Sequence, residues 1–421
     1  MPIVFVHGVA NRRGRGYERA FSSIERFLKN YVAPSISDDP DGVMVIDAYW
    51  GDLGAKFAWG RASRPRTPLL GMGPEDAPDE IRVQTYAQLY DQLRPIPVAE
   101  GSSRETGGLI AAGVPEGKPP LSSLPPDQLS DLAAAIIYSL ADDTEDDVEA
   151  ALIAADELAH DNQFRDELAE LEPPEQYDRF ASAVERRAEE ELGLVGQGIG
   201  WLGGLKDRIG EVFDRGRKAP GWAASRVLLE ARRPLHDMAS VFLGDIFEYL
   251  EERGDAGMPG AIEERVVSKL REAHEISQQR AGEPIIVLSH SMGGQIIYDI
   301  VTEFLPNATN GDENLFIDFW CAAASQVGFF EELKLFHNSS DQFSEANANL
   351  VPFPGSNLGF WWNVWDSSDI LSFTAEGIFD GVDDEEYVSG TSIISAHSGY
   401  FRRPSFYRAL AEKIRDASDG G

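Results

Sequence analysis

The sequence predicts an α/β protein, with a mainly parallel sheet whose strands are separated by a long, mostly helical segment. Three observations support this class. The chain has 421 residues, 43% of them hydrophobic, which is enough for a large core. A strand–helix–strand pattern opens the chain, and alternating strands and helices close it. Between these two parts, residues 51–282 show helical patterns and no convincing core strand.

The first part of the core is expected in residues 1–50. Ile3 to Val6 is a short apolar run rich in β-branched residues, which indicates a strand. Tyr17 to Val32 carries apolar residues at helical spacing, and Val43 to Trp50 is a second strand after the turn-forming segment Asp39 to Gly42. Strand, helix and strand in this order form the unit of a parallel sheet.

Residues 51–282 are expected to form a large, mainly helical insertion. The stretch from Leu70 to Pro126 is rich in Pro and Gly and is predicted to be loop. Helices are predicted after it at Leu129–Leu140, Val148–His160, Glu175–Leu192, between Ala223 and Leu250, and at Ala261–Gln279. An excursion near the carboxyl ends of the strands suits a lid or cap over a site, and a structural or oligomerisation domain is the alternative.

The second part of the core is expected in residues 283–421, where strands and helices alternate again. They are, in order, a strand at Ile285–Leu288, a helix at Gly293–Phe304, strands at Leu315–Trp320, Phe360–Trp365 and Tyr387–Ile394, and a helix at Pro404–Ala417. The α/β core is thus predicted to be split in the sequence by the helical insertion.

Composition restricts the partners and the compartment. Asp and Glu number 71 against 37 Lys and Arg, and the net charge of -34 repels nucleic acid and anionic membranes. The single cysteine, Cys321, excludes an intramolecular disulfide and fits a reducing compartment. Without a signal-peptide pattern or an apolar run of about 20 residues, a soluble, cytoplasmic protein with no transmembrane segment is expected. No Cys/His cluster, Walker sequence or Rossmann fingerprint is present, so neither a metal nor another cofactor is indicated.

The most specific motif lies at Pro284 to Ile297, where an apolar strand runs into Ser-His-Ser-Met-Gly (289–293) and then into an apolar helix. A serine on such a sharp turn, here Ser291, presents its hydroxyl at the amino terminus of the helix, which favours negative charge on a bound acyl oxygen. Small residues are needed two positions before and after it, and Ser289 and Gly293 meet this need. The alternative is a tight turn with an inert serine.

This segment resembles the nucleophile elbow of the α/β-hydrolase superfamily, in particular of lipases, esterases and acyl hydrolases whose elbow has a small residue followed by His-Ser-Met/Leu-Gly-Gly. The resemblance covers residues 2–50 and 284–415, and Ser289 in place of the first glycine is a mild departure. It implies an α/β-hydrolase fold with Ser291 as the nucleophile. It also implies a triad in the chain order Ser, Asp or Glu, His.

That order leaves His337 and His397 as candidates for the base, since only these histidines follow Ser291. His337 precedes the late strand that should carry the acid. His397 lies in a small-residue loop before the final helix, where this fold presents its base, and it is therefore preferred. Just past the late strand stand Asp366 and Asp369. Lipase-like relatives often end this strand with Asp-x-x-Asp and use the second residue, so the resemblance favours Asp369, with Asp366 as the alternative.

The resemblance also implies an oxyanion hole made of two backbone N–H groups. One belongs to Met292, directly after the nucleophile, and the other to Val9, in the loop after the first strand. His7 and Gly8 in that loop resemble the His-Gly motif of lipases. Gly8 lets the chain approach the substrate closely, and His7 is interpreted as a residue that positions the loop. Residues 244–250 resemble a Gly-Asp…Tyr run that precedes the elbow in some lipase-like proteins, which suggests that the insertion rejoins the core there.

These assignments predict acyl transfer to water, with His397 taking the proton from Ser291 as it attacks an ester carbonyl. Aromatic residues near the motifs suit a lipid ester, and a small ester is the alternative. An amidase or thioesterase would use the same triad, and the core could instead be a scaffold whose insertion binds a protein partner. The Gly-rich run Leu192–Leu205 leaves a membrane-surface contact open beside a role as a flexible packing segment. Nothing in the sequence indicates the oligomeric state.

Overall fold

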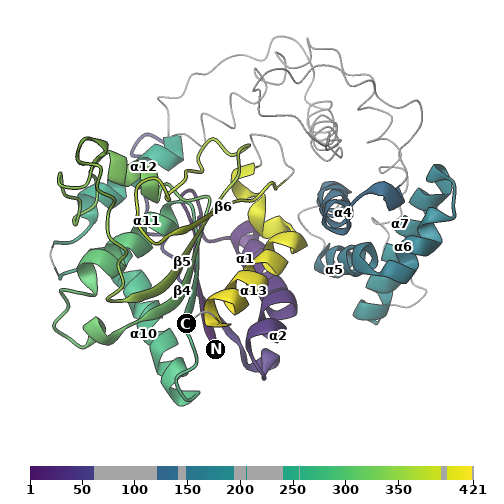
Figure 1. The fold of residues 1–421 in the computed structure, drawn as a ribbon, viewed down its shortest axis with the longest axis horizontal. Helices are drawn as coiled ribbons and strands as arrows, with labels where there is room; N and C mark the ends of the chain where they lie inside the picture. Colours follow the sequence, from purple (N-terminus) through teal and green to yellow (C-terminus); the bar gives the residue numbers. More distant parts are fainter. Residues whose placement is uncertain are drawn as a thin grey trace, which may run out of the picture.

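The computed structural model describes residues 1–60, 121–140, 148–193, 205, 240–255, 257–389 and 396–419. In this part of the chain, six strands form one sheet with helices on both faces (Figure 1). The strands are β1 (Pro2–Val6), β2 (Met44–Asp47), β3 (Ile286–His290), β4 (Ile317–Ala323), β5 (Leu358–Trp365) and β6 (Asp383–Glu386). All neighbours are parallel, in the order β2-β1-β3-β4-β5-β6, which confirms the predicted α/β class.

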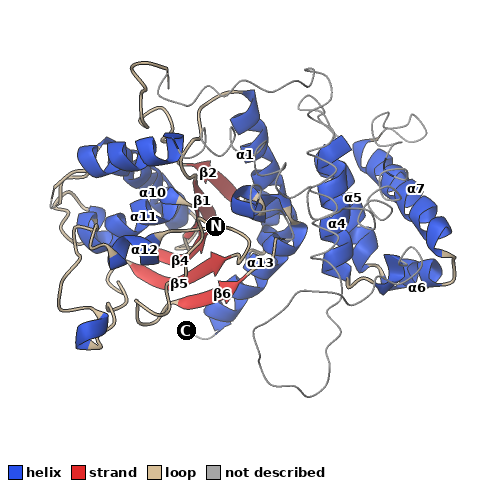
Figure 2. Ribbon diagram, turned by 90° about the horizontal axis from the view of Figure 1, so that it is seen from above, coloured by secondary structure: helices blue, strands red, loops and turns tan. Residues whose placement is uncertain are grey.

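The sheet lies between two layers of helices (Figure 2). The layer on one face contains α1 (Arg15–Phe27), its π-helical continuation η1 (Leu28–Val32), α2 (Ala33–Ile36) and α13 (Pro404–Asp419). The layer on the other face contains α10 (Ala261–Gln279), α11 (Met292–Asp299) with its continuation η5 (Ile300–Phe304), and α12 (Val327–Glu332). Both faces are therefore buried, which explains why the central strands are almost continuously apolar.

Side chains alternate between the two faces along β1. Ile3 and Phe5 belong to the hydrophobic core shared with α1 and α13, whereas Val4 and Val6 belong to the core shared with α10 and α11. This strict alternation fixes the strand's register. It also fixes which side chains emerge from its carboxyl end.

A second group of helices packs beside the sheet, on the side of α13 (Figure 1). It consists of α4 (Pro126–Leu140), α5 (Val148–His160), α6 (Asn162–Ala169) and α7 (Pro173–Leu192). Two buried acids attach this group to α13. The Ser405 hydroxyl is 2.9 Å from both carboxylate oxygens of Asp131, and Arg408 forms an ion pair with Asp156. The apolar faces of these helices join the same core as α1 and α13.

Some of the expected elements differ from those in the structure. The last strand was predicted at Tyr387–Ile394, but residues 387–389 are not strand and residues 390–395 lie outside the described part. The sixth strand is the acidic segment Asp383–Glu386 instead. An acidic strand is tolerated at this edge because the Lys413 ammonium lies 3.2 Å from Asp383 and 2.9 Å from Glu385. Helix α6 has no counterpart in the expected elements.

The remaining predictions for residues 51–282 are only partly covered. Residues 240–252 are helical, in agreement with the helical prediction that ends at Leu250, whereas residues 223–239 lie outside the described part. Most of the predicted loop from Leu70 and most of the Gly-rich run Leu192–Leu205 also lie outside it. Helix α10 packs on β1 and β2 and is the crossover helix that leads to β3. Within the described residues, no helix is both long enough and apolar enough to span a bilayer.

Candidate active site

The carboxyl ends of β1 and β3 meet where the strand order reverses. β1 pairs with β2 on one side and with β3 on the other, and the helices that follow β1 and β3 cover opposite faces of the sheet (Figure 2). In open parallel sheets, ligands bind in the crevice at such a switch point. His7 and Gly8 follow β1, and Ser291 follows β3, so three of the expected site residues converge here.

Ser291 stands on a strained turn at the amino terminus of α11. Its backbone has φ 51° and ψ −127°, in a region that non-glycine residues rarely adopt. Two backbone hydrogen bonds hold this conformation: the Ser291 N–H donates to Ala323 at 3.0 Å, and the Ser291 carbonyl accepts from Gly294 at 2.9 Å. The elbow geometry expected from the motif is therefore present.

Close contacts around Ser291 require glycine at two positions, one in α11 and one in the loop after β1. A Cβ at Gly293 would lie 2.4 Å from the Val6 carbonyl oxygen, and a Cβ at Gly8 would lie 2.5 Å from the Ser291 Cβ. Ser289 is buried, and its hydroxyl accepts a hydrogen bond from the Trp320 indole N–H at 2.8 Å. A glycine could not accept this bond, which gives a physical reason for serine at this position.

His397 lies between Ser291 and Asp369. Its Nε2 is 2.9 Å from the Ser291 Oγ, and its Nδ1 is 2.9 Å from Oδ2 of Asp369. The other carboxylate oxygen of the buried Asp369 accepts the Leu371 N–H at 3.0 Å, which fixes the carboxylate's orientation. With the Nδ1 proton directed at Asp369, Nε2 is the nitrogen that can take a proton from the serine.

These three residues come from separate elements. Ser291 follows β3, and Asp369 lies in the turn after β5. His397 lies in η8 (Ala396–Ser398), shortly before η9 (Tyr400–Arg402) and α13. The structure thus brings together residues separated by up to 106 positions, at distances suited to a nucleophile, its base and an orienting acid.

The two alternative candidates have other contacts. The Asp366 carboxylate accepts the N–H groups of Ser368 and Ser389, each at 2.8 Å, and its carbonyl accepts the Asp369 N–H at 2.9 Å. Asp366 therefore shapes the turn that carries Asp369. His337 lies against Phe304, and its N–H is 3.4 Å from a carboxylate oxygen of Asp299. Neither residue joins the Ser291–His397 pair.

His7 fastens the loop that follows β1. Its Nδ1 lies 2.7 Å from the Gly8 carbonyl oxygen, and its Nε2 accepts the Trp50 backbone N–H at 3.0 Å. The Trp50 indole donates in turn to the His7 carbonyl at 2.7 Å. Burial lowers the pKa of His7 to about 4, so its ring is neutral near pH 7. Both ring nitrogens have partners, which suits a positioning role.

The same loop carries Val9, the expected second oxyanion donor. Val9 is half-buried, and the Asn11 amide donates to the carbonyls of Gly8 and Val9 at 3.0 and 3.2 Å. Ala10 has a left-handed backbone with φ 64°. Met292, the other expected donor, is the first residue of α11, where backbone N–H groups point out of the helix. Both expected donors therefore stand on backbone beside Ser291.

Sequence reasoning missed two residues that position this site. Asp245 is fully buried, and its carboxylate accepts the Ala10 and Ala55 N–H groups, both at 2.8 Å, and the Arg12 guanidinium at 2.7 Å. It thereby clamps the loop that carries Val9, and the Gly-Asp…Tyr run was the signal that could have found it. His290 donates from Nε2 to the His397 carbonyl at 2.6 Å, and its place in the His-Ser-Met motif was the signal that could have found it.

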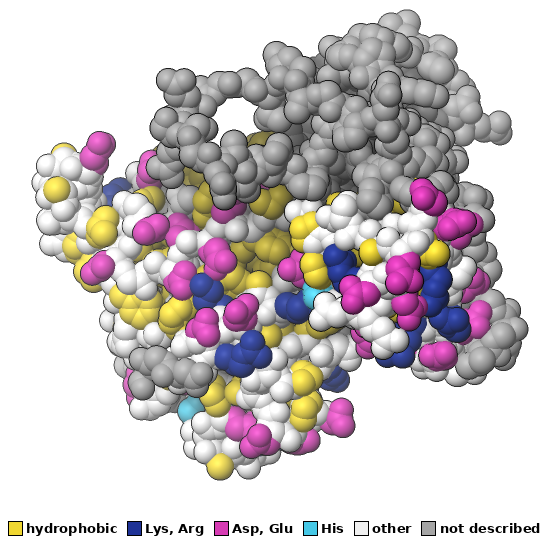
Figure 3. Space-filling model, turned by 45° about the vertical axis from the view of Figure 1, so that its right-hand side comes forward, with side chains coloured by type: hydrophobic (Ala, Val, Ile, Leu, Met, Phe, Trp, Pro, Cys, Tyr) yellow, Lys and Arg dark blue, Asp and Glu magenta, His cyan; other side chains and the backbone are white. Residues whose placement is uncertain are grey.

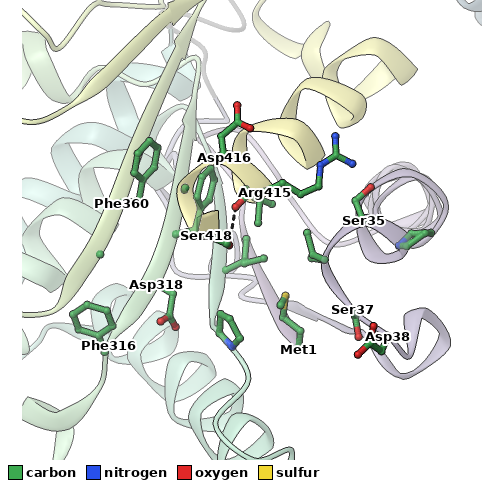
Figure 4. A pocket seen from close by; sticks show the side chains of 18 residues that line it. Met1, Ser35, Ser37, Asp38, Phe316, Asp318, Phe360, Arg415, Asp416 and Ser418 are labelled. Atoms are coloured by element: carbon green, nitrogen blue, oxygen red, sulfur yellow. Dashed lines mark hydrogen bonds between the residues drawn. The ribbon is translucent and has the colours of Figure 1, made fainter. Parts of the chain in front are cut away.

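Cavities lie near both ends of the parallel strands. The larger, about 990 Å³, lies at the amino ends of the strands, between Met1, Asp318, Phe360 and the end of α13 (Figure 4). The strands run from this cavity toward Ser291, so the cavity and the triad lie at opposite ends of the strands. A second cavity of about 650 Å³ is lined by residues next to the triad, including His7 and Ser398.

Among the described residues, no group of three or more His, Cys, Asp or Glu side chains is arranged to hold a metal ion. Comparison with protein-family models, curated proteins and solved structures finds no match to this chain.

Proposed function

We propose that the protein is a serine hydrolase with an α/β-hydrolase fold and that it cleaves a carboxylic ester. The observation that carries the proposal is the pair of 2.9 Å contacts that join Ser291, His397 and Asp369. A merely structural serine would not need a strained backbone, a histidine on its hydroxyl and a buried carboxylate behind that histidine.

The reaction proceeds through an acyl-enzyme. His397 Nε2 takes the Ser291 proton as the oxygen attacks the ester carbonyl, and the buried Asp369 stabilises the imidazolium that forms. His397 then gives the proton to the departing alcohol. In the second half, His397 takes a proton from water, which attacks the acyl-enzyme. His397 then returns this proton to the Ser291 oxygen as the acyl bond breaks, which releases the acid and free Ser291. Protons and acyl group balance without any cofactor.

The backbone supplies the oxyanion hole in this proposal. The N–H groups of Met292 and Val9 bind the oxygen that becomes negative when Ser291 attacks, and the helix dipole of α11 favours that charge. Asp245 and Asn11 hold the Val9 loop before substrate arrives, so the donors need little reorganisation during the reaction.

Apolar side chains beside the triad support an ester with an apolar portion. Ile370, directly after Asp369, is 61% exposed, and the exposed Phe329 stacks on Phe373 at 4.9 Å. Exposed large apolar side chains often mark surfaces that bind apolar ligands. We therefore expect longer acyl chains to react better than acetate.

A series of 4-nitrophenyl esters from acetate to decanoate tests this function. Wild-type protein should release 4-nitrophenol with a preference for longer acyl chains, and Ser291→Ala should lose at least about 10⁴-fold in kcat/KM. Equal turnover by Ser291→Ala would place the hydrolysis elsewhere. Anilides and thioesters of the best acyl group complete the panel, and a higher kcat/KM for either would replace ester as the substrate class.

A further inference from the structure

The cleft of about 650 Å³ lies directly beside the triad. It opens between α1, the start of α5 at Val148, and the η8–η9 segment. Two of its lining residues are chain neighbours of residues that touch Ser291: His7 precedes Gly8, and Ser398 follows His397. Because consecutive Cα atoms are about 3.8 Å apart, an ester bound at the triad would extend readily into this cleft. Its volume is typical of sites for small molecules.

The charge of the cleft is opposite to that of the chain. Arg15, Arg19 and Arg402 line it, and Glu149 is the one acid among the described lining residues, although the protein carries a net charge of -34. Arg15 and Arg19 form no ion pair with any residue in the described part of the chain. Other arginines nearby are paired: Arg12 with Asp245 and Arg26 with Glu191.

Apolar side chains make up much of the inner wall of the cleft, beside the polar residues His7 and Tyr17. Phe5, Phe21, Ile24 and Phe401 line it and are buried or half-buried. Ser23 also lines it and is 7% exposed, and its hydroxyl has no hydrogen-bond partner within the described structure. The Ser23 oxygen itself is shielded from solvent, so a ligand in the cleft would contact the apolar wall rather than this hydroxyl.

The amino terminus of α1 adds to this electrostatic field. Arg15 and Gly16 begin the helix, and both line the cleft. The residue before them, Gly14, has no side chain to cap the first turn. The N–H groups of this turn carry partial positive charge, which reinforces that of the two arginines. A cationic rim and the amino terminus of α1 thus share one cavity beside the triad.

We propose that this cleft binds an anionic group of the substrate, so that the enzyme acts on esters that also carry a carboxylate or a phosphate. The inference rests on the proposed hydrolase function for its location beside the reacting ester. Arg15 and Arg19 bind the anion, and the phenylalanines that line the cleft cover its apolar linker.

A matched pair of esters tests this specificity. Mono-4-nitrophenyl glutarate carries a free carboxylate, whereas its methyl ester has nearly the same shape without the charge. Wild-type protein should have the higher kcat/KM for the anion. In Arg15→Gln/Arg19→Gln this preference should fall at least about tenfold, mainly through a raised KM for the anion, because each charge-assisted hydrogen bond is strong. Glutamine preserves helix propensity in α1.

The control variant is Arg186→Gln/Arg415→Gln. Both residues are exposed arginines on helices, and neither lines the cleft, so the same charge change is made elsewhere. The preference for the anion should be unchanged in this variant. If wild-type protein cleaves both esters equally, or if both double variants lose the preference equally, the assignment of the cleft is overturned.

A binding measurement separates this inference from the proposed function. Calorimetric titration of Ser291→Ala with glutarate and with phenyl phosphate needs no turnover, and comparison of the two ligands distinguishes a carboxylate site from a phosphate site. Binding that is lost in the Arg15/Arg19 double variant supports the anion site even if no ester is cleaved, in which case only the hydrolase proposal fails. The absence of binding of either anion at millimolar concentration and low salt overturns the anion site, whatever the ester assays show.

Discussion

Two carboxylates three positions apart have different tasks in this site. Asp369 contacts His397, whereas Asp366 binds the backbone of its own turn and of Ser389. In the sequence both stand at the end of a strand with similar neighbours. Their separate roles become visible only when the turn after β5 is folded, because its conformation decides which carboxylate faces the histidine.

Asparagine substitutions at these two positions should therefore have different effects. Asp369→Asn removes the acceptor that fixes the His397 tautomer, and we expect a loss of about 10⁴-fold in kcat with little change in fold. Asp366→Asn weakens the turn but leaves the His397 contact, so we expect a lower Tm and a much smaller loss of activity. Measurements of kcat and Tm for both variants distinguish the catalytic role of Asp369 from the structural role of Asp366. If Asp366→Asn were as inactive as Asp369→Asn while still folded, the assignment of the acid would be wrong.

Gly8 offers a test of how closely the loop after β1 approaches the nucleophile. A Cβ there would lie 2.5 Å from that of Ser291, so Gly8→Ala must displace the serine or the loop. Misplacement by about 1 Å costs roughly 100-fold in rate. The matched control is Gly377→Ala, an exposed position where nothing lies within 4 Å of the added Cβ. This control should retain activity and gain stability by about 0.4–1 kcal/mol, measured by urea unfolding.

At the level of elements, α10, α11 and the helical residues 240–252 share a buried polar cluster. The Tyr249 hydroxyl donates to Asp299 at 2.6 Å, and Arg253 lies 3.2 Å from the same carboxylate. Glu263 of α10 is fully buried beside them. Burial, and the nearby charge of Asp299, raise the pKa of Glu263 to about 7. The cluster joins three helices that all lie within residues 240–299.

The raised pKa of Glu263 makes stability depend on pH. Its pKa is about 4.5 when exposed and about 7 in the folded protein, so the native state binds more protons between these values. The contribution of Glu263 to the free energy of unfolding is therefore fully present below pH 4.5 and is lost as the pH rises through about 7. Glu263→Gln, which cannot ionise, should therefore stabilise the protein at pH 8 by up to about 3 kcal/mol and have little effect at pH 4.5.

Calorimetric unfolding at pH 4.5 and pH 8 measures this difference. Glu275→Gln, an exposed position on the same helix, is the control and should show no such pH-dependent gain. A Glu263→Gln variant with the same stability difference from wild type at both pH values would contradict a raised pKa.

Elements were predictable where the chain's own pattern determines them. β1, β3 and β5 are apolar runs with clear boundaries, and α5 coincides with its predicted range Val148–His160. β6 was not predictable because its acidic residues look like a solvated turn until Lys413 and the Trp362 indole are placed beside them. α6 is short and largely exposed: its cap, the Asp161 side chain bound to the Gln163 N–H, is a local signal, but its apolar face consists of only Phe164 and Leu168.

For the whole molecule, the dominant electrostatic property is the net charge of -34. Acidic side chains are distributed over the visible face in Figure 3. Repulsion among them opposes the compact state, and salt screens it. We expect the Tm at pH 7 to rise by several degrees between 10 and 300 mM NaCl. An unchanged or lower Tm in a differential scanning experiment would show that local ion pairs outweigh the general repulsion.

The overall arrangement was only partly predictable from the sequence. The elbow motif and the order of the remaining histidines led to Ser291 and His397, because that geometry is encoded locally and by chain order. The clamp formed by Asp245 joins residues 235 positions apart, and the cleft beside α1 is lined by residues from Phe5 to Arg402. No local pattern reports such contacts. The same holds for the helices α4 to α7, whose attachment to α13 through Asp131 and Asp156 is a property of the folded chain.

The most direct test of the proposed hydrolase function is covalent labelling with a fluorophosphonate, followed by mass spectrometry of the labelled peptide. We expect a single adduct on Ser291 in wild-type protein, no adduct in Ser291→Ala, slow labelling in Asp369→Asn and near-normal labelling in Asp366→Asn. Folded wild-type protein that stays unlabelled, or that carries the adduct on another serine, would contradict the assignment of Ser291 as the nucleophile.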